Sequence, residues 1–379
     1  MVTHPQETTA PSRLGGTPEP GMPEAGMPAL ALAAILDAAM PLEPTPLPRQ
    51  SLPRYSPPPQ SGRSRDPADL FEAAQAGDKA AIGRLLSLVE RGGDPARHVG
   101  ELTFAASAGV QQVVGVTGAP GGGKSTLTDR LIAAARADGG QVGVLAVDPS
   151  SPFSGGAILG DRIRMQSHTL DDGVFIRSMA TRGHLGGLAL AAPEAIRVLA
   201  AVGMSRVIVE TVGVGQVEVE VADATDTTLV VVTPGWGDSV QASKAGLLEV
   251  ADIFVINKAE RDGAAETRRD LDNMLDLNPS MGAWRPPILL TTATTGEGVD
   301  AVWSAVIDHR AHLEVTGDLA RRRERRLVEE MSRVLVHLLE RDVRALEGGD
   351  HFEAVKVELL ARRLDPYHAA ARLLEAERR

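Results

Sequence analysis

One segment of the chain, residues 118–125, reads Gly-Ala-Pro-Gly-Gly-Gly-Lys-Ser and matches the phosphate-loop pattern GxxxxGK(S/T) in full. Glycines let backbone N–H groups turn toward phosphate oxygens, and a helix that starts at the loop adds the positive end of its dipole. Lys124 supplies a charge for the β- and γ-phosphates, and the Ser125 hydroxyl can bind Mg²⁺. The alternative is a chance glycine-rich turn, which the strand before the loop and the helix after it disfavour. The predicted phosphate-binding glycines are Gly118, Gly121, Gly122 and Gly123.

Acidic residues that could complete a metal site follow two hydrophobic runs. Asp148 comes directly after residues 142–147, and Glu210 ends the run 206–210. An acid in such a place is often only a helix cap or a turn residue. Beside a phosphate loop, however, both are expected to serve Mg²⁺. Gly213 lies three residues after Glu210, the spacing at which its N–H can sense the γ-phosphate and release the following loop after hydrolysis.

The segment Asn257-Lys258-Ala259-Glu260 follows the run 253–256 and resembles the NKxD motif of GTPases. In that motif the Asn holds the loop, the Lys lies along the purine and the acid accepts hydrogen bonds from guanine N1 and N2. Glu260 is one methylene longer than the usual Asp. The loop Thr292-Ala293-Thr294, which precedes Gly296, fits the second guanine contact, in which a backbone N–H meets O6, and Ala293 is its predicted nucleotide-binding residue. By itself such a segment is a surface turn, and its place in the strand order favours GTP and GDP as ligands.

The length, net charge, apolar content and cysteine content of the chain exclude several classes of protein. Its 379 residues are enough for about two or three domains. A net charge of −11 argues against binding to nucleic acid or to anionic membranes. No apolar run approaches the ~18 residues of a membrane span, and residues 30–40 are too short and lack the basic start of a signal peptide. The absence of cysteine excludes disulfides and thiolate metal sites and fits a cytoplasmic protein.

Short β-branched runs alternate with helical patterns along most of the chain. This order predicts an α/β fold of the P-loop NTPase type, with a mostly parallel sheet covered by helices on both faces. Ligands of such sheets lie beyond the carboxyl ends of the strands, where the candidate residues fall. The predicted strands are residues 111–117, 142–147, 174–177, 206–210, 228–233, 253–257 and 288–292, and the helices between them 124–137, 185–202, 239–250, 264–277 and 298–309.

The regions outside the sheet differ from it in amino-acid composition and in hydrophobic pattern. Residues 1–64 hold 14 of the 25 prolines and are expected to be a disordered tail. Residues 65–110 form an N-terminal helical segment, in which one helical pattern runs from Asp69 to Val89. Residues 111–312 form the GTPase domain, and 313–379 a C-terminal helical arm suited to dimerisation, with helices on the stripe 327–338 and over 352–364. The arginine-rich run 321–326 is interpreted as the solvated side of a helix rather than a nucleic-acid patch.

Taken together, these motifs resemble the MeaB/ArgK family of P-loop GTPases. The resemblance covers residues 66–379 and leaves the proline-rich tail outside it. Its most specific segments are Val-Asp-Pro-Ser-Ser-Pro at 147–152 and Glu-Thr-Val-Gly-Val-Gly-Gln at 210–216, joined by 118–126, 156–165, 177–188, 234–246, 257–260 and 292–298. Besides Glu260, the chain departs from the family at Ala242, Ser243 and Ala245.

The resemblance implies roles for particular residues. Ser125, Asp148, Asp161 and Glu210 surround Mg²⁺, Thr126 joins the nucleotide-binding set, and Arg164 lies near the phosphates. Asp238 and Lys244 fall in a further mobile loop that faces the partner. The implied catalytic residues are Lys124, Asp161, Arg164, Glu210 and Lys244.

Family members act as chaperones of adenosylcobalamin-dependent acyl-CoA mutases, chiefly methylmalonyl-CoA mutase. The resemblance therefore implies a dimeric GTPase that couples hydrolysis to cofactor loading and protection of the mutase, which itself holds the cobalamin. The proposed chemistry is in-line attack of water on the γ-phosphate, with Mg²⁺ and Lys124 taking up charge. Gln216 is the nearest candidate for orienting that water; the alternative is that it only begins the helix indicated by the aliphatic residues after it.

Three other functions stay open at this point. A nickel or cobalt metallochaperone GTPase is disfavoured because the chain has no Cys and its nine His are scattered. A kinase or ATPase linked to amino-acid transport would need a second substrate pocket. A non-hydrolysing binding module would use the nucleotide only as a structural ligand.

Overall fold

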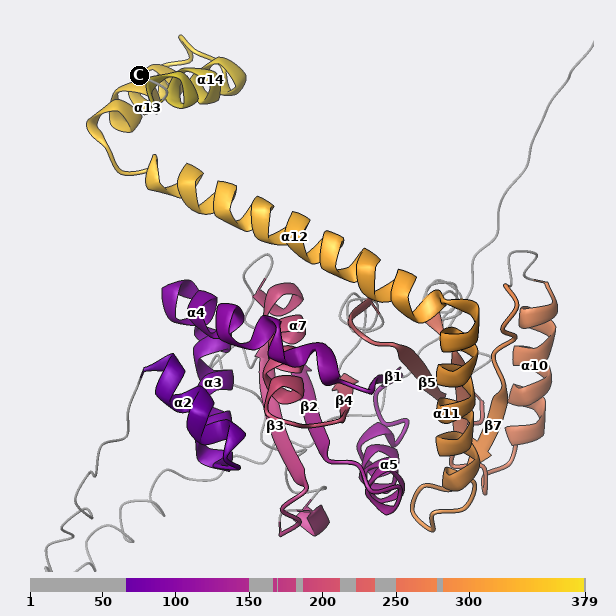
Figure 1. Ribbon diagram of the computed structural model, residues 1–379. Helices are drawn as coiled ribbons and strands as arrows, with labels where there is room; N and C mark the ends of the chain where they lie inside the picture. The colour runs from indigo at the N-terminus through magenta and orange to yellow at the C-terminus, as the bar shows by residue number, and fades with distance from the viewer. Residues whose placement is uncertain are drawn as a thin grey trace, which may run out of the picture. The chain divides into compact units, whose positions relative to one another are not determined.

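The computed structural model describes residues 66–149, 166–168, 170–181, 187–211, 223–235, 250–277 and 282–377. Its described strands form one sheet in the order β3-β2-β4-β1-β5-β6-β7, in which every neighbouring pair is parallel (Figure 1). The predicted α/β fold is therefore confirmed. The strands are β1 (Gln112–Gly118), β2 (Val142–Pro149), β3 (Val174–Thr181), β4 (Arg206–Thr211), β5 (Thr227–Val232), β6 (Ile253–Asn257) and β7 (Ile288–Thr291).

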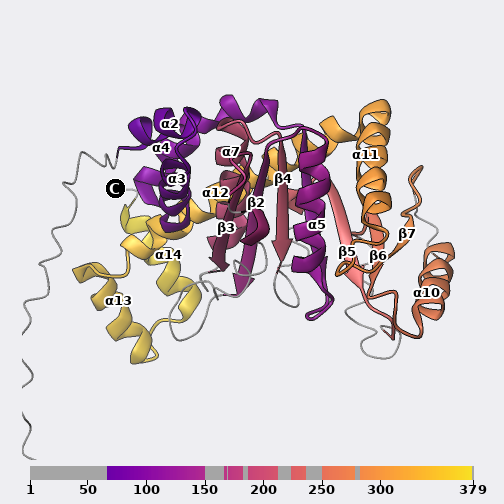
Figure 2. The same ribbon diagram turned by 90° about the horizontal axis from the view of Figure 1, so that it is seen from below.

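Helices cover both faces of this sheet, as Figure 2 shows from below. On one face, α5 (Lys124–Ala137) and α11 (Val299–Thr316) pack on side chains that include Val231. On the other, α7 (Gly187–Ala201) shares a core with the N-terminal helices, and α10 (Ala264–Asp276) packs on side chains that include Val230. Successive residues of β5 thus point to opposite covered faces. This explains why the strands read as continuous apolar runs rather than alternating ones.

The N-terminal segment is more divided than the sequence predicted. The single pattern expected from Asp69 to Val89 is two helices, α2 (Pro67–Gln75) and α3 (Lys79–Arg91), and α4 (Gly93–Phe104) follows. Gly77 has a φ of 95°, and the Asp78 carboxylate caps α3 by accepting from the Ala80 N–H at 2.7 Å and the Ala81 N–H at 3.1 Å. A positive φ and a new N-cap break the chain between two helices that share one apolar face.

The C-terminal arm consists of α12 (Asp318–Ala345), α13 (Asp350–Leu360) and α14 (Pro366–Glu377). The second helix ends at Leu360, whereas the sequence predicted that it would reach residue 364. The reason is a third helix that has its own cap, because Asp365 accepts from the Tyr367 N–H at 2.9 Å and Pro366 occupies the first helical position. Among the helices of the described residues, none combines the length and apolar character needed to cross a bilayer.

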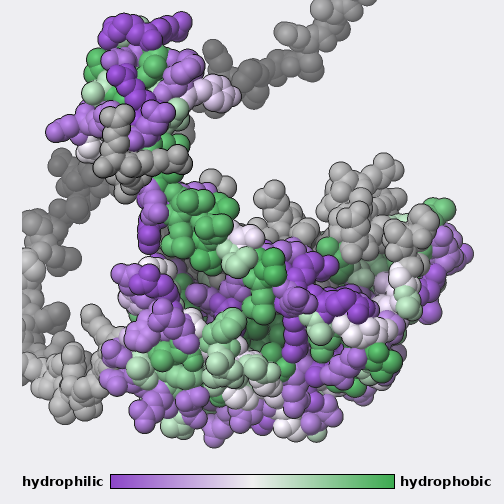
Figure 3. Space-filling model, turned by 45° about the horizontal axis from the view of Figure 1, so that its top comes forward, coloured by the Kyte–Doolittle hydropathy of each residue, from purple (hydrophilic) through white to green (hydrophobic). Residues whose placement is uncertain are grey.

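One side of α12 carries large apolar side chains that are exposed to solvent. Figure 3 shows them as a green stretch along the helix, bordered by purple polar groups. Exposed apolar stretches of this kind mark interaction surfaces more often than accidents of sequence. We call this set the apolar face of α12; its members are Leu327, Val328, Met331, Val334, Leu335, Leu338 and Leu339.

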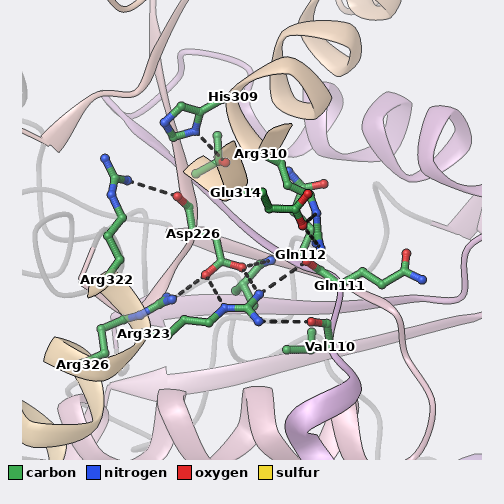
Figure 4. A network of polar contacts seen from close by, with 12 residues as sticks. Val110, Gln111, Gln112, Asp226, His309, Arg310, Glu314, Arg322, Arg323 and Arg326 are labelled. Carbon is green, nitrogen blue, oxygen red and sulfur yellow. Dashed lines mark hydrogen bonds and ion pairs between the residues drawn. The ribbon is translucent and has the colours of Figure 1, made fainter. Parts of the chain in front are cut away.

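The arginine run of α12 is solvated on one side only, so that interpretation holds in part. Arg321 and Arg325 are exposed, whereas the other three arginines of the run bind buried carboxylates. Arg323 Nη2 donates to Asp226 Oδ2 at 2.7 Å, and Arg326 also binds Asp226, a carboxylate that is 1% exposed (Figure 4). Arg322 Nη2 donates to Asp252 Oδ1 at 3.0 Å. Burial alone would raise the pKa of Asp226, but the two guanidinium groups outweigh it and lower that pKa. The run therefore fastens α12 to the start of β5 and, through Asp252, to the residue before β6.

Candidate functional site

The phosphate loop leaves β1 at the carboxyl edge of the sheet and requires glycine at its first position. Gly118 has a φ of 129°, and a Cβ built there would lie 2.0 Å from the Val231 carbonyl oxygen of the neighbouring strand β5. Gly121 and Gly123 also have positive φ values, 73° and 86°. Such angles turn the loop so that backbone N–H groups face a phosphate rather than the sheet.

Lys124 is the first residue of α5 and is 6% exposed. Its Nζ donates to the carbonyl oxygens of Gly118 at 2.6 Å and Ala119 at 3.1 Å, so the ammonium lies over the loop. Thr126, in the same first turn, is half-buried. The positive end of α5 and this ammonium group together suit a triphosphate.

Ser125 and Glu210 meet beside the loop. The Ser125 hydroxyl donates to Glu210 Oε1 at 2.6 Å, and the two residues are 5% and 0% exposed. The register of the sheet causes this contact, because Glu210 on β4 pairs with Val116 on β1. Hydroxyl and carboxylate oxygens are the ligands that Mg²⁺ prefers, so the two side chains fit that ion.

Several other predicted site residues lie outside the part of the chain that the structure describes. Asp161 and the side chain of Asp148 lie outside the described residues, as do Arg164, Gly213, Gln216, Asp238 and Lys244. Within the described part of the chain no group of three or more His, Cys, Asp or Glu side chains is arranged to hold a metal.

Asn257 joins the base-reading segment to the phosphate loop. Its Nδ2 donates to the Gly122 carbonyl at 2.8 Å, and its Oδ1 accepts from the Thr291 hydroxyl and the Ala293 N–H, both at 3.1 Å. The side chain is 2% exposed, so each of these bonds replaces water. One amide thus holds three segments that are far apart in sequence.

Lys258 makes a second connection to the loop, because its Nζ donates to the Gly121 carbonyl at 2.7 Å. Its φ of 60° is unusual for a residue with a side chain. The Arg261 N–H donates to the Lys258 carbonyl at 3.0 Å and closes a turn, on which Glu260 is exposed. The predicted guanine-reading residues Asn257, Lys258 and Glu260 therefore stand together at the carboxyl end of β6.

Sequence reasoning missed two side chains that support the site. Thr291 helps to hold Asn257, and Arg130 on α5 donates from Nε to the Ala293 carbonyl at 3.2 Å and from Nη2 to the Thr294 carbonyl at 2.9 Å. Neither residue belongs to a local motif. Both contacts join segments more than 30 residues apart, so only the folded chain reveals them.

The parallel sheet, the loop between β1 and α5 and the cross-links to residues 257–258 define a P-loop nucleoside triphosphatase. Residues 82–347 match the family model described as "Methylmalonyl Co-A mutase-associated GTPase MeaB". The chain belongs to this MeaB family and is a GTP hydrolase.

The sequences of two related proteins and one solved structure support this family membership. A Pyrococcus horikoshii protein assigned as a GTPase is 47% identical over 81% of this chain and 97% of its own length. The mouse protein named methylmalonic aciduria type A homolog, mitochondrial, is 36% identical over 56% of this chain and 52% of its own. The crystal structure of a protein named LAO/AO transport system kinase superposes with a TM-score of 0.60 at 26% identity, covering 84% of this chain and 99% of that one.

Proposed function

We propose that this GTPase is a chaperone of an adenosylcobalamin-dependent acyl-CoA mutase, most directly methylmalonyl-CoA mutase, and that it couples GTP hydrolysis to cofactor loading and protection of the mutase. The observation that carries the proposal is the family match over residues 82–347, whose description names association with that mutase. The mouse relative, named for methylmalonic aciduria, supports the same partner. The cobalamin belongs to the mutase in this account.

Hydrolysis begins when water attacks the γ-phosphate in line with the leaving oxygen. Lys124, held over the loop by the Gly118 and Ala119 carbonyls, takes up charge on the β- and γ-phosphates. Ser125 and Glu210 would hold Mg²⁺, with Asp148 and Asp161 as further proposed ligands; the bound ion neutralises charge on the phosphate oxygens. We assign Arg164 to the phosphates and Gly213 to sensing the γ-phosphate, and Lys244 to the partner-facing loop.

Guanine is read by residues 257–260 and by the loop after β7. Lys258 lies along the purine, Glu260 accepts from N1 and N2, and a backbone N–H of the loop at Ala293 donates to O6. The cross-links from Asn257 to Gly122 and from Lys258 to Gly121 support this assignment, since they fix the base-reading turn against the phosphate loop.

The arm at residues 313–379 is proposed to form a homodimer through the apolar face of α12. Leu335 is 56% exposed and lies in the middle of that face, so a charge there would have to be buried in the dimer. Leu335→Glu should convert the dimer to a monomer in sedimentation experiments. Leu277→Glu is the control, because Leu277 is 81% exposed at the end of α10, outside the arm, and should leave the dimer intact.

The two N-terminal regions and the cellular location of the protein are assigned as the sequence predicts. Residues 65–110 serve as an N-terminal helical segment that packs on α7, and residues 1–64 as a tail outside the matched region. The absence of cysteine in all 379 residues supports a cytoplasmic location.

The proposal is tested by mixing the purified chain with purified methylmalonyl-CoA mutase in the presence of GDP or a non-hydrolysable GTP analogue. A complex that elutes together in size-exclusion chromatography, and whose amount changes with the nucleotide, is the expected result. If no complex forms with either nucleotide, the chaperone role is contradicted.

A second candidate, an ATP-dependent kinase linked to amino-acid transport, rests on the name of the similar protein of known crystal structure. The two are separated by single-turnover hydrolysis with GTP and with ATP. Preference for ATP and transfer of the γ-phosphate to an acceptor other than water would favour the kinase.

A further inference from the structure

We infer that Arg130 is a positioning residue for guanine recognition, which holds the loop after β7 so that a backbone N–H points at guanine O6. Arg130 lies on α5, the helix that the phosphate loop opens. The inference rests on the proposed reading of O6 by the loop at Ala293, and it adds a residue that no motif of the chain contains.

The contact of Arg130 is directed at backbone rather than at another side chain. Its Nε donates to the Ala293 carbonyl at 3.2 Å and its Nη2 to the Thr294 carbonyl at 2.9 Å. A guanidinium group presents these two donors in a rigid fork, so it fixes the orientation of two consecutive carbonyls at once. A lysine in its place would supply charge without that geometry.

Fixing a carbonyl also fixes the N–H on the other side of the same peptide. Because the peptide unit is planar and trans, its N–H points opposite to its carbonyl. With the Ala293 carbonyl held toward α5, the Thr294 N–H must point away from Arg130. The Ala293 N–H, in the preceding peptide, donates to Asn257 Oδ1 at 3.1 Å. Arg130 and Asn257 therefore hold the loop from two sides.

The loop is otherwise held mainly by bonds within itself. The Thr292 N–H donates to the Glu297 carbonyl, and the Thr295 and Gly296 N–H groups both donate to the Thr292 carbonyl, each at 3.0 Å. These bonds give the loop its local shape but do not set its position relative to the phosphate loop. Arg130 and Asn257 do: Arg130 ties the loop to α5, which begins at Lys124, and Asn257 ties Ala293 to Gly122 of the phosphate loop. The distance between the triphosphate and the base contact is thereby set from two sides.

This role predicts that replacing Arg130 weakens the contact with a single atom of the base, guanine O6. GTP, ITP and 6-thio-GTP separate the contacts: ITP lacks the 2-amino group, and 6-thio-GTP keeps that group and N1–H but replaces O6 with sulfur, a weak acceptor. The ratio of the Kd of 6-thio-GTP to the Kd of GTP measures the O6 contact. The ratio of the Kd of ITP to the Kd of GTP measures the contact with the 2-amino group.

The experiment determines both ratios for the full chain, Arg130→Gln and Arg130→Lys. Arg130→Gln should weaken GTP about tenfold, bring the 6-thio-GTP ratio close to one and leave the ITP ratio unchanged. For Arg130→Lys, the Kd of GTP and the 6-thio-GTP ratio should lie between those of the unchanged chain and those of Arg130→Gln. The control is Arg136→Gln, since Arg136 lies on the same helix but binds Asp171 at 2.8 and 2.9 Å, and both ratios should stay as in the unchanged chain.

The inference is overturned if Arg130→Gln weakens all three nucleotides equally, as loss of a merely structural contact would, or if it changes none of them. A different result would contradict the proposed base site itself. If the unchanged chain binds GTP and 6-thio-GTP equally well, the loop after β7 does not read O6, whatever Arg130 does.

Discussion

The Nδ2 atom of Asn257 lies so close to Gly123 that a Cβ built on the glycine would be 2.3 Å away from it. The phosphate loop and the base-reading segment therefore share one tightly packed contact. Gly123→Ala should push the Asn257 amide off the Gly122 carbonyl and reduce GTP affinity about tenfold or more. Isothermal titration with GTP measures this.

Gly139→Ala is the matched control for that substitution. Gly139 has a φ of 80°, close to the 86° of Gly123, but a Cβ there would meet nothing within 4 Å. Both variants carry the strain of a positive φ, about 1 to 2 kcal/mol, and only Gly123→Ala should lose GTP affinity. Equal losses in the two variants would show that backbone strain, and not the displaced amide, is responsible.

Ser125 and Glu210 are predicted to set the requirement for Mg²⁺. Glu210→Gln and Ser125→Ala each remove one proposed ligand, and the concentration of Mg²⁺ that gives half-maximal hydrolysis should rise about 10- to 100-fold. Ser304→Ala, on the exposed side of α11, should leave that concentration unchanged. A Glu210→Gln protein with an unaltered Mg²⁺ requirement would remove Glu210 from the metal site.

Asp226 is predicted to be essential for seating α12. Asp226→Asn leaves Arg323 and Arg326 without the charge that they bind, and breaking a buried ion pair in this way costs roughly 3 to 5 kcal/mol. Denaturant unfolding measures the loss. Asp318→Asn, which breaks an exposed pair with Arg321 at 2.5 Å, should change the free energy of unfolding little. Comparable effects of the two substitutions would contradict the role of Asp226.

Glu194 is predicted to make stability depend on pH. Burial raises its pKa from 4.5 to about 7; Glu330 adds to the rise, whereas Arg197 opposes it. A raised pKa means that the folded chain holds the proton more tightly than the unfolded chain. The contribution to stability is therefore full below pH 4.5 and is lost as the pH rises toward 7.

Glu194→Gln removes this dependence, because the amide cannot ionise. The variant should match the unchanged chain near pH 4.5 and exceed its free energy of unfolding at pH 8 by on the order of 2 kcal/mol. Unfolding curves at both pH values measure the difference, and Glu324→Gln, exposed on α12, is the control. A variant less stable than the unchanged chain at pH 8 would show that ionised Glu194 is stabilising.

The sheet could be predicted from the sequence because each strand is a local signal. β4, β5 and β6 are buried along their whole length, so each one contains a run of consecutive apolar residues without the alternation of a half-exposed strand. The phosphate loop was equally local, since its glycines, lysine and serine are consecutive. The meeting of Ser125 with Glu210 followed because the phosphate loop leaves the carboxyl end of β1, and Glu210 lies near the carboxyl end of the adjacent parallel strand β4.

The role of the arginine run could not be predicted, because its partners lie far away in sequence. Arg323 and Asp226 are 97 residues apart, and the run by itself has the composition of a solvated helix. Arg130 was missed for the same reason, since its contact with Ala293 spans 163 residues. The division between α2 and α3 was missed because both helices turn their apolar sides to one core.

The most direct test of the account is the rate of GTP hydrolysis measured with and without methylmalonyl-CoA mutase. The chain alone should turn over slowly, the mutase should raise the rate about tenfold or more, and Lys124→Ala should abolish hydrolysis in both cases. Equal rates with and without the mutase, or stimulation that survives Lys124→Ala, would contradict the account.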